Sequence, residues 1–206
     1  QPAERPRILW CTREKTKLDL LIRLFFAGST LDRNEAIRAI EPASLTALAE
    51  DGLLTIAGDN VSASLRLYPF GDQPFLSDWM LPGQPRSSDV VMGLGSSTRT
   101  LAAATIRHQW GRVLDVGTGG GVHAILASSH SGRVVGSDIN QRGLEMARLA
   151  AQLNGVTNVE FREGSWYEPV HGEKFDLIVS NPPFVISPEH RYLYRDGGMR
   201  GDLLCR

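Results

Sequence analysis

Cysteine, clustered histidine and long apolar runs are what this sequence has least of. The two cysteines, Cys11 and Cys205, lie near opposite ends of the 206 residues and form neither a disulfide framework nor a metal-ligand spacing. The five histidines are scattered in the same way, so we expect no metal site. No apolar run approaches the roughly 20 residues that cross a bilayer. These absences argue against a secreted or membrane protein and predict a cytoplasmic one.

An excess of one charge is also missing. Lysine and arginine number 22, aspartate and glutamate number 23, and the net charge is −1. This balance argues against a strongly basic nucleic-acid footprint over the whole molecule, without excluding a local patch. The 42% apolar content supplies a core, which excludes a collagenous, low-complexity or disordered chain.

Turn-forming residues cluster between positions 71 and 88 and divide the chain. Glycine, proline and serine recur there, as in a linker. We therefore expect a boundary near residue 86, with an accessory domain and linker over 1–86 and a second domain over 87–206. Neither part carries a marked excess of one charge.

The first part has the pattern of three short helices. Apolar residues repeat at helical spacing over 16–28, and Asp32 is suited to cap a helix over 33–40 whose apolar face holds Ala36, Ile37 and Ile40. Pro42 suits the first turn of a third helix.

A β-hairpin follows these helices. Residues 53–67 alternate in polarity around a turn at 58–60. Three helices and a hairpin resemble a winged-helix domain, a small α+β fold. The third helix offers Glu50 and Asp51 where a DNA reader would present arginine or asparagine, so we interpret the domain as accessory.

The second part alternates strands and helices. The pattern predicts strands over 112–116, 133–138, 159–162 and 175–180, with helices over 122–129 and 141–153. Continuous apolar strands separated by helices indicate a parallel sheet that is covered on both faces. Ligands of such sheets bind beyond the carboxyl ends of the strands, where the unusual residues of this chain lie.

The first of these strands runs into a glycine-rich turn, DVGTGGG over 115–121. Glycines let the backbone turn tightly and approach a ligand closely. Asp138 ends the next strand, and a carboxylate there can accept both hydroxyls of a ribose. The alternative is that Asp138 only caps the following helix.

A glycine turn followed by an acidic residue suits either a dinucleotide or S-adenosylmethionine (SAM). Asp115 stands two residues before the first glycine, so we expect its carboxylate to face the amino-acid end of the ligand. A pyrophosphate would be repelled there. This favours SAM.

The most specific string in the chain is Asn181-Pro182-Pro183-Phe184, at the end of the fourth strand. Proline has no N–H, so the carbonyl groups around the two prolines have no local donor competing for them. The Asn181 side-chain oxygen and the Pro182 carbonyl can accept the two hydrogens of a planar NH₂ group, and Phe184 can stack on its plane. This positions the nitrogen for attack on an electrophilic methyl group.

With these motifs in this order, residues 87–206 resemble the class I SAM-dependent methyltransferases, an α/β Rossmann-like fold. The resemblance is to the members with an Asn-Pro-Pro-aromatic motif: the HemK-like release-factor glutamine, small-domain rRNA guanine-N2 and N6-adenine methyltransferases. It implies that the motif grips the target nitrogen. It also implies that SAM is held by Asp115, Gly117, Thr118, Gly119, Gly121, Asp138, Ile139, Ser165, Trp166 and Asn181, with Ser97 and Thr98 in a loop that closes over it.

The same resemblance leads us to expect a truncated core. A class I fold has seven strands, and this sequence ends after the fourth, near a Gly-Gly-x-x-Gly stretch over 197–204. The absence of an initiator methionine agrees with a processed or truncated chain.

The substrate stays open between a protein glutamine and an RNA or DNA base. The near-zero charge and the acidic third helix favour a protein. Arg191, Arg195 and Arg200 either contact an anionic substrate or form a solvated face. We interpret His123 as a residue beside the cofactor or on a helix surface. The alternatives in other classes are a non-catalytic SAM-binding module and a dinucleotide-dependent oxidoreductase.

Overall fold

The computed structural model describes residues 4–80, 87–184 and 193–196. Two compact units divide between Tyr68 and Pro69, inside strand β4 (Arg66–Phe70). The sequence predicted a boundary near residue 86. The division lies earlier because the next strand, β5 (Gln73–Ser77), packs on the second unit, where Asn154 Nδ2 donates to Pro74 O at 2.8 Å.

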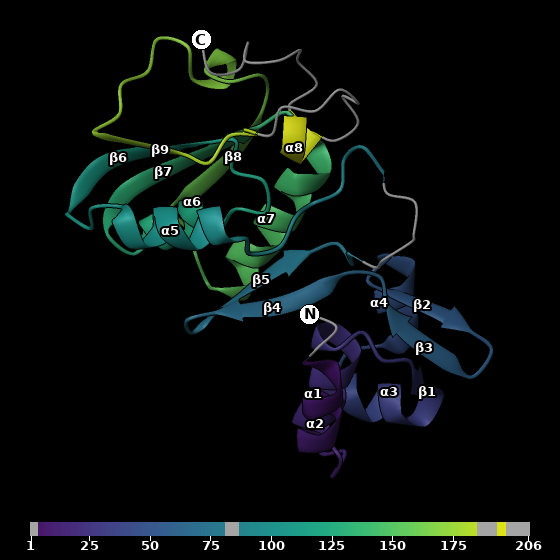
Figure 1. The fold of residues 1–206 in the computed structure, drawn as a ribbon. Coiled ribbons are helices and arrows are strands. Elements are labelled where there is room, and N and C mark those ends of the chain that lie inside the picture. The colour runs from purple at the N-terminus through teal and green to yellow at the C-terminus, as the bar shows by residue number, and fades with distance from the viewer. Residues whose placement is uncertain (1–3, 81–86, 185–192, 197–206) are drawn as a thin grey trace. The chain divides into compact units, whose positions relative to one another are not determined.

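The first unit combines short helices with a small antiparallel sheet of order β1-β3-β2 (Figure 1). Its elements are α1 (Arg5–Cys11), α2 (Lys17–Leu21), the π-helical turn η1 (Ile22–Phe26), β1 (Leu31–Asp32), α3 (Arg33–Ile40), α4 (Leu45–Glu50), β2 (Leu54–Ala57) and β3 (Asn60–Ala63). The hairpin predicted over 53–67 is therefore present as β2 and β3.

Side-chain caps set where these helices begin. Asp32 accepts a hydrogen bond from Glu35 N at 2.9 Å and caps α3, as the sequence predicted. The expectation for Pro42 is wrong, because α4 begins later, capped by Ser44, which accepts from Ala47 N. The apolar face of α3 is rotated as well: Ile37 is 37% exposed, and Ala39 is buried instead.

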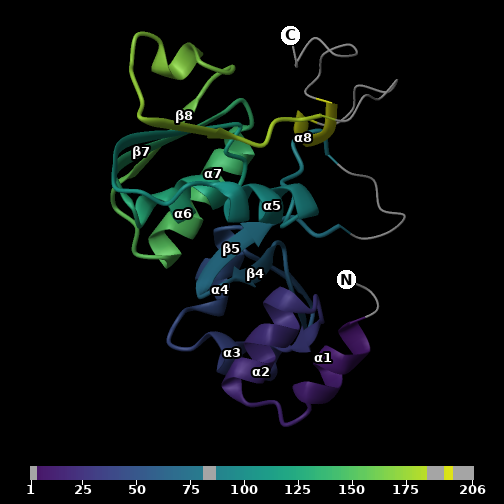
Figure 2. The same cartoon turned by 60° about the vertical axis from the view of Figure 1, so that its left-hand side comes forward.

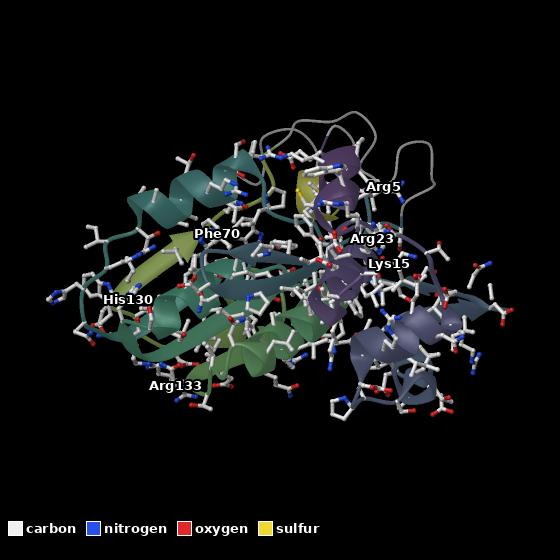
Figure 3. The ribbon with its side chains drawn as sticks, turned by 90° about the horizontal axis from the view of Figure 1, so that it is seen from below. Arg5, Lys15, Arg23, Phe70, His130 and Arg133 are labelled. Atoms are coloured by element: carbon white, nitrogen blue, oxygen red, sulfur yellow. The ribbon has the colours of Figure 1, made fainter. Side chains whose placement is uncertain are left out.

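Helix α1 was not predicted, and none of its residues is buried. Arg23 of η1, labelled in Figure 3, holds α1 in place. Its Nη2 donates to Leu9 O at 2.8 Å and its Nε to Thr12 O at 3.0 Å. Hydrogen bonds, rather than a stripe of buried apolar residues, hold α1 in place, so the sequence had no helical pattern from which to predict it.

The second unit is built on a parallel sheet whose order is β8-β7-β6-β9 in the part of the chain that the structure describes. Its strands are β6 (Trp110–Val116), β7 (Ser131–Asp138), β8 (Val159–Glu163) and β9 (Leu177–Ser180). Its helices are α5 (Ser96–Ala104), α6 (Val122–Ser128), α7 (Gln141–Leu153), the 3₁₀ turn η2 (Glu168–Val170) and α8 (Leu193–Asp196). The predicted parallel sheet is confirmed, and α7 has the predicted bounds.

Helices α5, α6 and α7 lie on one face of this sheet, and the segment from β8 to β9 lies over the other (Figures 1 and 2). On the helical face Val113 and Val134 pack with Ala124 of α6. On the other face Leu114 and Val135 form part of a second cluster. From β6 the chain continues through β7 and β8 on one side, and then returns to place β9 on the other side of β6. The order of the strands therefore reverses at β6, and sheets of this kind bind ligands at such a point.

None of the helices in the described ranges is long and apolar enough to cross a bilayer. Over the same ranges, no group of three or more histidine, cysteine, aspartate or glutamate side chains could hold a metal ion.

Candidate functional site

A cavity of about 380 Å³ opens at the carboxyl ends of the parallel strands. Its walls come from the segments after β6, β7, β8 and β9, from the segment leading into α5, and from α8. The predicted site residues that line it are Ser97, Thr98, Gly117, Thr118, Gly119, Asp138, Ile139, Ser165, Trp166, Asn181, Pro182, Pro183 and Phe184.

Asp115 is not in this lining. It is 0% exposed, and its Oδ2 accepts hydrogen bonds from Thr118 Oγ1 at 2.6 Å and Ala124 N at 3.0 Å. Burial raises the pKa of its carboxyl to about 7. Asp115 therefore braces the glycine turn against α6 from beneath, rather than facing the amino-acid end of a ligand as the sequence led us to expect.

The glycines of the turn have two different roles. Gly117 and Gly119 have φ of 71° and 52° and line the cavity. Apart from each glycine and its two chain neighbours, no described atom lies within 4 Å of where a Cβ would be. Gly121, predicted to hold the cofactor, is absent from the lining: with φ of 82°, its Cβ would lie 2.8 Å from Ala147 Cβ. The first two leave an open cradle, and the third lets α7 approach.

Asp138 closes the cradle at the end of β7. Its Oδ2 accepts from Gly119 N at 2.7 Å and its Oδ1 from Asn140 N at 2.8 Å, and burial raises its pKa. The cap of α7 is Asn140, which accepts from Gly143 N, so the capping alternative for Asp138 is wrong. A carboxylate has about four acceptor positions, so both oxygens keep capacity for a ligand's hydroxyls.

The Asn-Pro-Pro-Phe motif begins directly after β9. Ser180 Oγ donates to Val116 O at 2.9 Å, which joins the last residue of β9 to the last residue of β6. Asn181 consequently enters the cavity wall beside the glycine turn. Phe184 lines the same wall and is 63% exposed, so its ring is accessible for stacking.

Sequence reasoning missed part of the site's surroundings. Ser97 and Thr98 lie in the first turn of α5 rather than in a loop. His123 lines the cavity but is only 7% exposed, so the helix-surface interpretation is wrong. Burial lowers its pKa to about 4, and its Nε2 has no hydrogen-bond partner among the described residues.

Two expectations fall outside the described residues. Arg191, Arg200 and the glycine-rich stretch over 197–204 lie there, as does the side chain of Arg195. The structure therefore tests neither an anionic contact by these arginines nor the role of that stretch.

Comparisons with protein-family models match the two units of the chain separately. Residues 92–194 match the family model described as "Methyltransferase small domain", and residues 3–64 match one described as "Domain of unknown function (DUF7059)". A release factor glutamine methyltransferase of Aliivibrio fischeri is 45% identical over 76 residues, which are 35% of this chain and 27% of that protein. One of Fusobacterium nucleatum is 31% identical over 129 residues, 59% of this chain and 36% of that protein. The chain thus spans well under half the length of these relatives.

Solved structures give partial matches. A ribosomal protein L11 methylase of Lactobacillus delbrueckii subsp. bulgaricus is 32% identical, covers 41% of this chain and 44% of that one, and has a TM-score of 0.37. The 16S rRNA N2 G1207 methyltransferase of T. thermophilus, solved with AdoMet and guanosine, is 16% identical, covers 78% and 48%, and has a TM-score of 0.45.

Proposed function

Because the chain belongs to the methyltransferase small domain family, we propose that its second unit moves the methyl group of SAM onto a planar nitrogen held at the Asn-Pro-Pro-Phe motif. Membership of this family confirms the expected resemblance to methyltransferases, and the parallel sheet agrees with the expected Rossmann-like core. Family membership supports methyl transfer and SAM as the cofactor, which are part of the proposal. The residues that hold the cofactor, the target nitrogen and the substrate are part of the proposal.

The cavity fits SAM in two respects. Gly117 and Gly119 leave the cradle open where side chains would fill it, so a ligand can lie against the backbone. Asp138 presents a carboxylate with spare acceptor positions for the two hydroxyls of a ribose. SAM supplies an electrophilic methyl group carried on a sulfonium.

The target nitrogen is positioned by the motif. The Asn181 side-chain oxygen and the Pro182 carbonyl accept the two hydrogens of an NH₂ group, while Phe184 stacks on its plane. An amide or exocyclic amine nitrogen is a weak nucleophile because its lone pair is delocalised. Holding both hydrogens orients the nitrogen toward the methyl group and stabilises the charge that develops on it.

One observation carries this proposal. The hydrogen bond from Ser180 to Val116 O brings the motif and the glycine turn into the wall of one cavity. A nitrogen held at the motif and a methyl donor held at the turn would then share an enclosed space, which in-line transfer requires.

We propose a protein glutamine as the substrate. Its side-chain amide is planar and carries two hydrogens, and the relatives with 41–45% identity are named release factor glutamine methyltransferases. An RNA or DNA base amine meets the same geometric demand. Methyl transfer from labelled SAM to glutamine peptides, to ribosomal RNA and to DNA distinguishes these substrates, and labelling of nucleic acid alone would replace the glutamine proposal.

Asn181→Ala tests the role of the motif. We expect SAM still to bind, with at most a small loss of affinity, because Asn181 is only one of its expected contacts and the substitution leaves the glycine turn and Asp138 intact. Transfer should fall at least about tenfold, because one of the two acceptors for the target NH₂ is lost. Calorimetric titration with SAM and transfer of labelled methyl measure the two effects separately.

The matched control is Asn34→Ala, at an exposed position of α3, which should change neither quantity. Full transfer by Asn181→Ala would remove Asn181 from the mechanism. Tight SAM binding by the wild type without transfer to any substrate would support the non-catalytic SAM-binding module instead, and binding of NAD without SAM the oxidoreductase.

A further inference from the structure

The segment over 88–92 forms part of the cavity wall without being a helix or a strand. Val90, Val91 and Met92 line the cavity, and the first two are 6% and 3% exposed. Since no regular ladder or helix fixes this backbone, its position depends on the few hydrogen bonds that it makes.

Several of these bonds come from one place, the first turn of α7 and its partner Asp78. Asn140 Nδ2 donates to Asp89 O at 2.7 Å. The backbone of Val91 makes two hydrogen bonds with Asp78: its N–H donates to the side-chain Oδ2 at 2.8 Å, and its carbonyl accepts from Asp78 N at 2.9 Å. Arg142 then binds both carboxylate oxygens of Asp78.

Asn140 makes three hydrogen bonds that link different parts of the site. Its N–H donates to Asp138, the proposed ribose ligand, and its side-chain oxygen accepts from Gly143 N as the cap of α7. Its amide nitrogen reaches the wall segment at Asp89. The side chain is 8% exposed and lines the cavity, so it connects the proposed ribose end of the site to the wall segment over 88–92.

We propose that Asn140 is a positioning residue for the cofactor, whose amide sets the wall segment over 88–92 against the ribose end of the cavity. This inference rests on the proposed function. Asn140 acts through its hydrogen bond to Asp89 O. Two residues later, Val91 is held by Asp78, which is itself bound by Arg142. Capping and positioning use different atoms of the same side chain, so they can be separated.

Asn140→Ser separates them. Serine is as good an N-cap as asparagine, but its shorter side chain has no amide to donate to Asp89 O. We expect a fall in the unfolding midpoint no larger than that of the control below, faster amide hydrogen exchange at Val91 without ligand, and a dissociation constant for SAM raised about tenfold, the effect of one lost buried hydrogen bond. Asn140→Ala should raise the constant equally and lower the midpoint further, because the cap is lost as well.

Asn158→Ser is the matched control. Asn158 Nδ2 also donates to two backbone carbonyls, of Ser128 and Ser131, but it precedes β8 at the amino end of the sheet, remote from the cavity. We expect this variant to lower the unfolding midpoint and to leave SAM binding unchanged.

The outcomes distinguish the two proposals. If the wild type binds no SAM, the proposed function is wrong, and this inference with it. If the wild type binds SAM and Asn140→Ser binds equally well, the inference alone is overturned. A control that loses as much affinity as Asn140→Ser for a similar fall in the midpoint would also overturn it.

Discussion

Gly121→Ala is expected to lower the free energy of unfolding by about 2–5 kcal/mol. The left-handed conformation at φ of 82° costs an L-residue roughly 1–2 kcal/mol. The new methyl would lie 2.8 Å from Ala147 Cβ and 3.2 Å from Ala147 Cα. These atoms belong to the buried face of α7, so the helix itself must shift, and such overpacking typically costs about 1–3 kcal/mol.

Gly155→Ala is the control for the conformational part of this effect. Gly155 has φ of 64°, and no described atom lies within 4 Å of its added Cβ. We expect it to cost only about 1–2 kcal/mol. Denaturant unfolding of both variants measures the difference, and equal losses would show that contact with α7 does not explain Gly121.

The glycine turn was only partly predictable from the sequence. Its pattern predicted a tight turn at the end of a strand, which the structure confirms at β6. The pattern could not show that Gly117 and Gly119 border open space whereas Gly121 contacts Ala147. Ala147 lies in α7, 26 residues further along the chain, and only the fold brings the two together. The sequence therefore assigned one role to all three.

The expectation that Asp115 faces the ligand failed for a related reason. In β6, Val113 to Val116 are all buried, because helices cover one face and the segment before β9 covers the other. A strand that is buried on both faces has no alternation to reveal which way a charged residue within the buried stretch points. The strong helical period of α7, by contrast, predicted its bounds, and the cavity formed where parallel strands end.

The two buried titratable groups beside the glycine turn predict opposite pH dependences of stability. The folded pKa of Asp115 is raised from 3.8 to about 7, so the folded state binds a proton that the unfolded state releases in this range. Its contribution is present at low pH and is lost as the pH rises through 7. His123 has a folded pKa lowered from 6.5 to about 4, so its unfolded form binds the extra proton and stability is lost as the pH falls.

The variants Asp115→Asn and His123→Leu each remove one of these two contributions to the pH dependence of stability. Relative to the wild type, we expect Asp115→Asn to gain stability as the pH rises from 4 to 7, and His123→Leu to gain stability as the pH falls from 6.5 to 4. The change in the free energy of unfolding is at most roughly 1.4 kcal/mol per pH unit, which is about 4 kcal/mol over the range of Asp115 and about 3 kcal/mol over that of His123. Denaturant unfolding at several pH values measures the differences.

The wild type should respond little to these two groups between pH 4 and 6.5, because the slopes have opposite signs and nearly the same range. Differences from the wild type that run in the same direction for both variants would contradict the assignment. A buried acid braces the turn through Thr118 and Ala124, and a buried base lines the cavity beside it. Their opposed titrations offset each other, so the pH dependence that remains at the turn comes from Asp138, whose raised pKa makes stability fall as the pH rises.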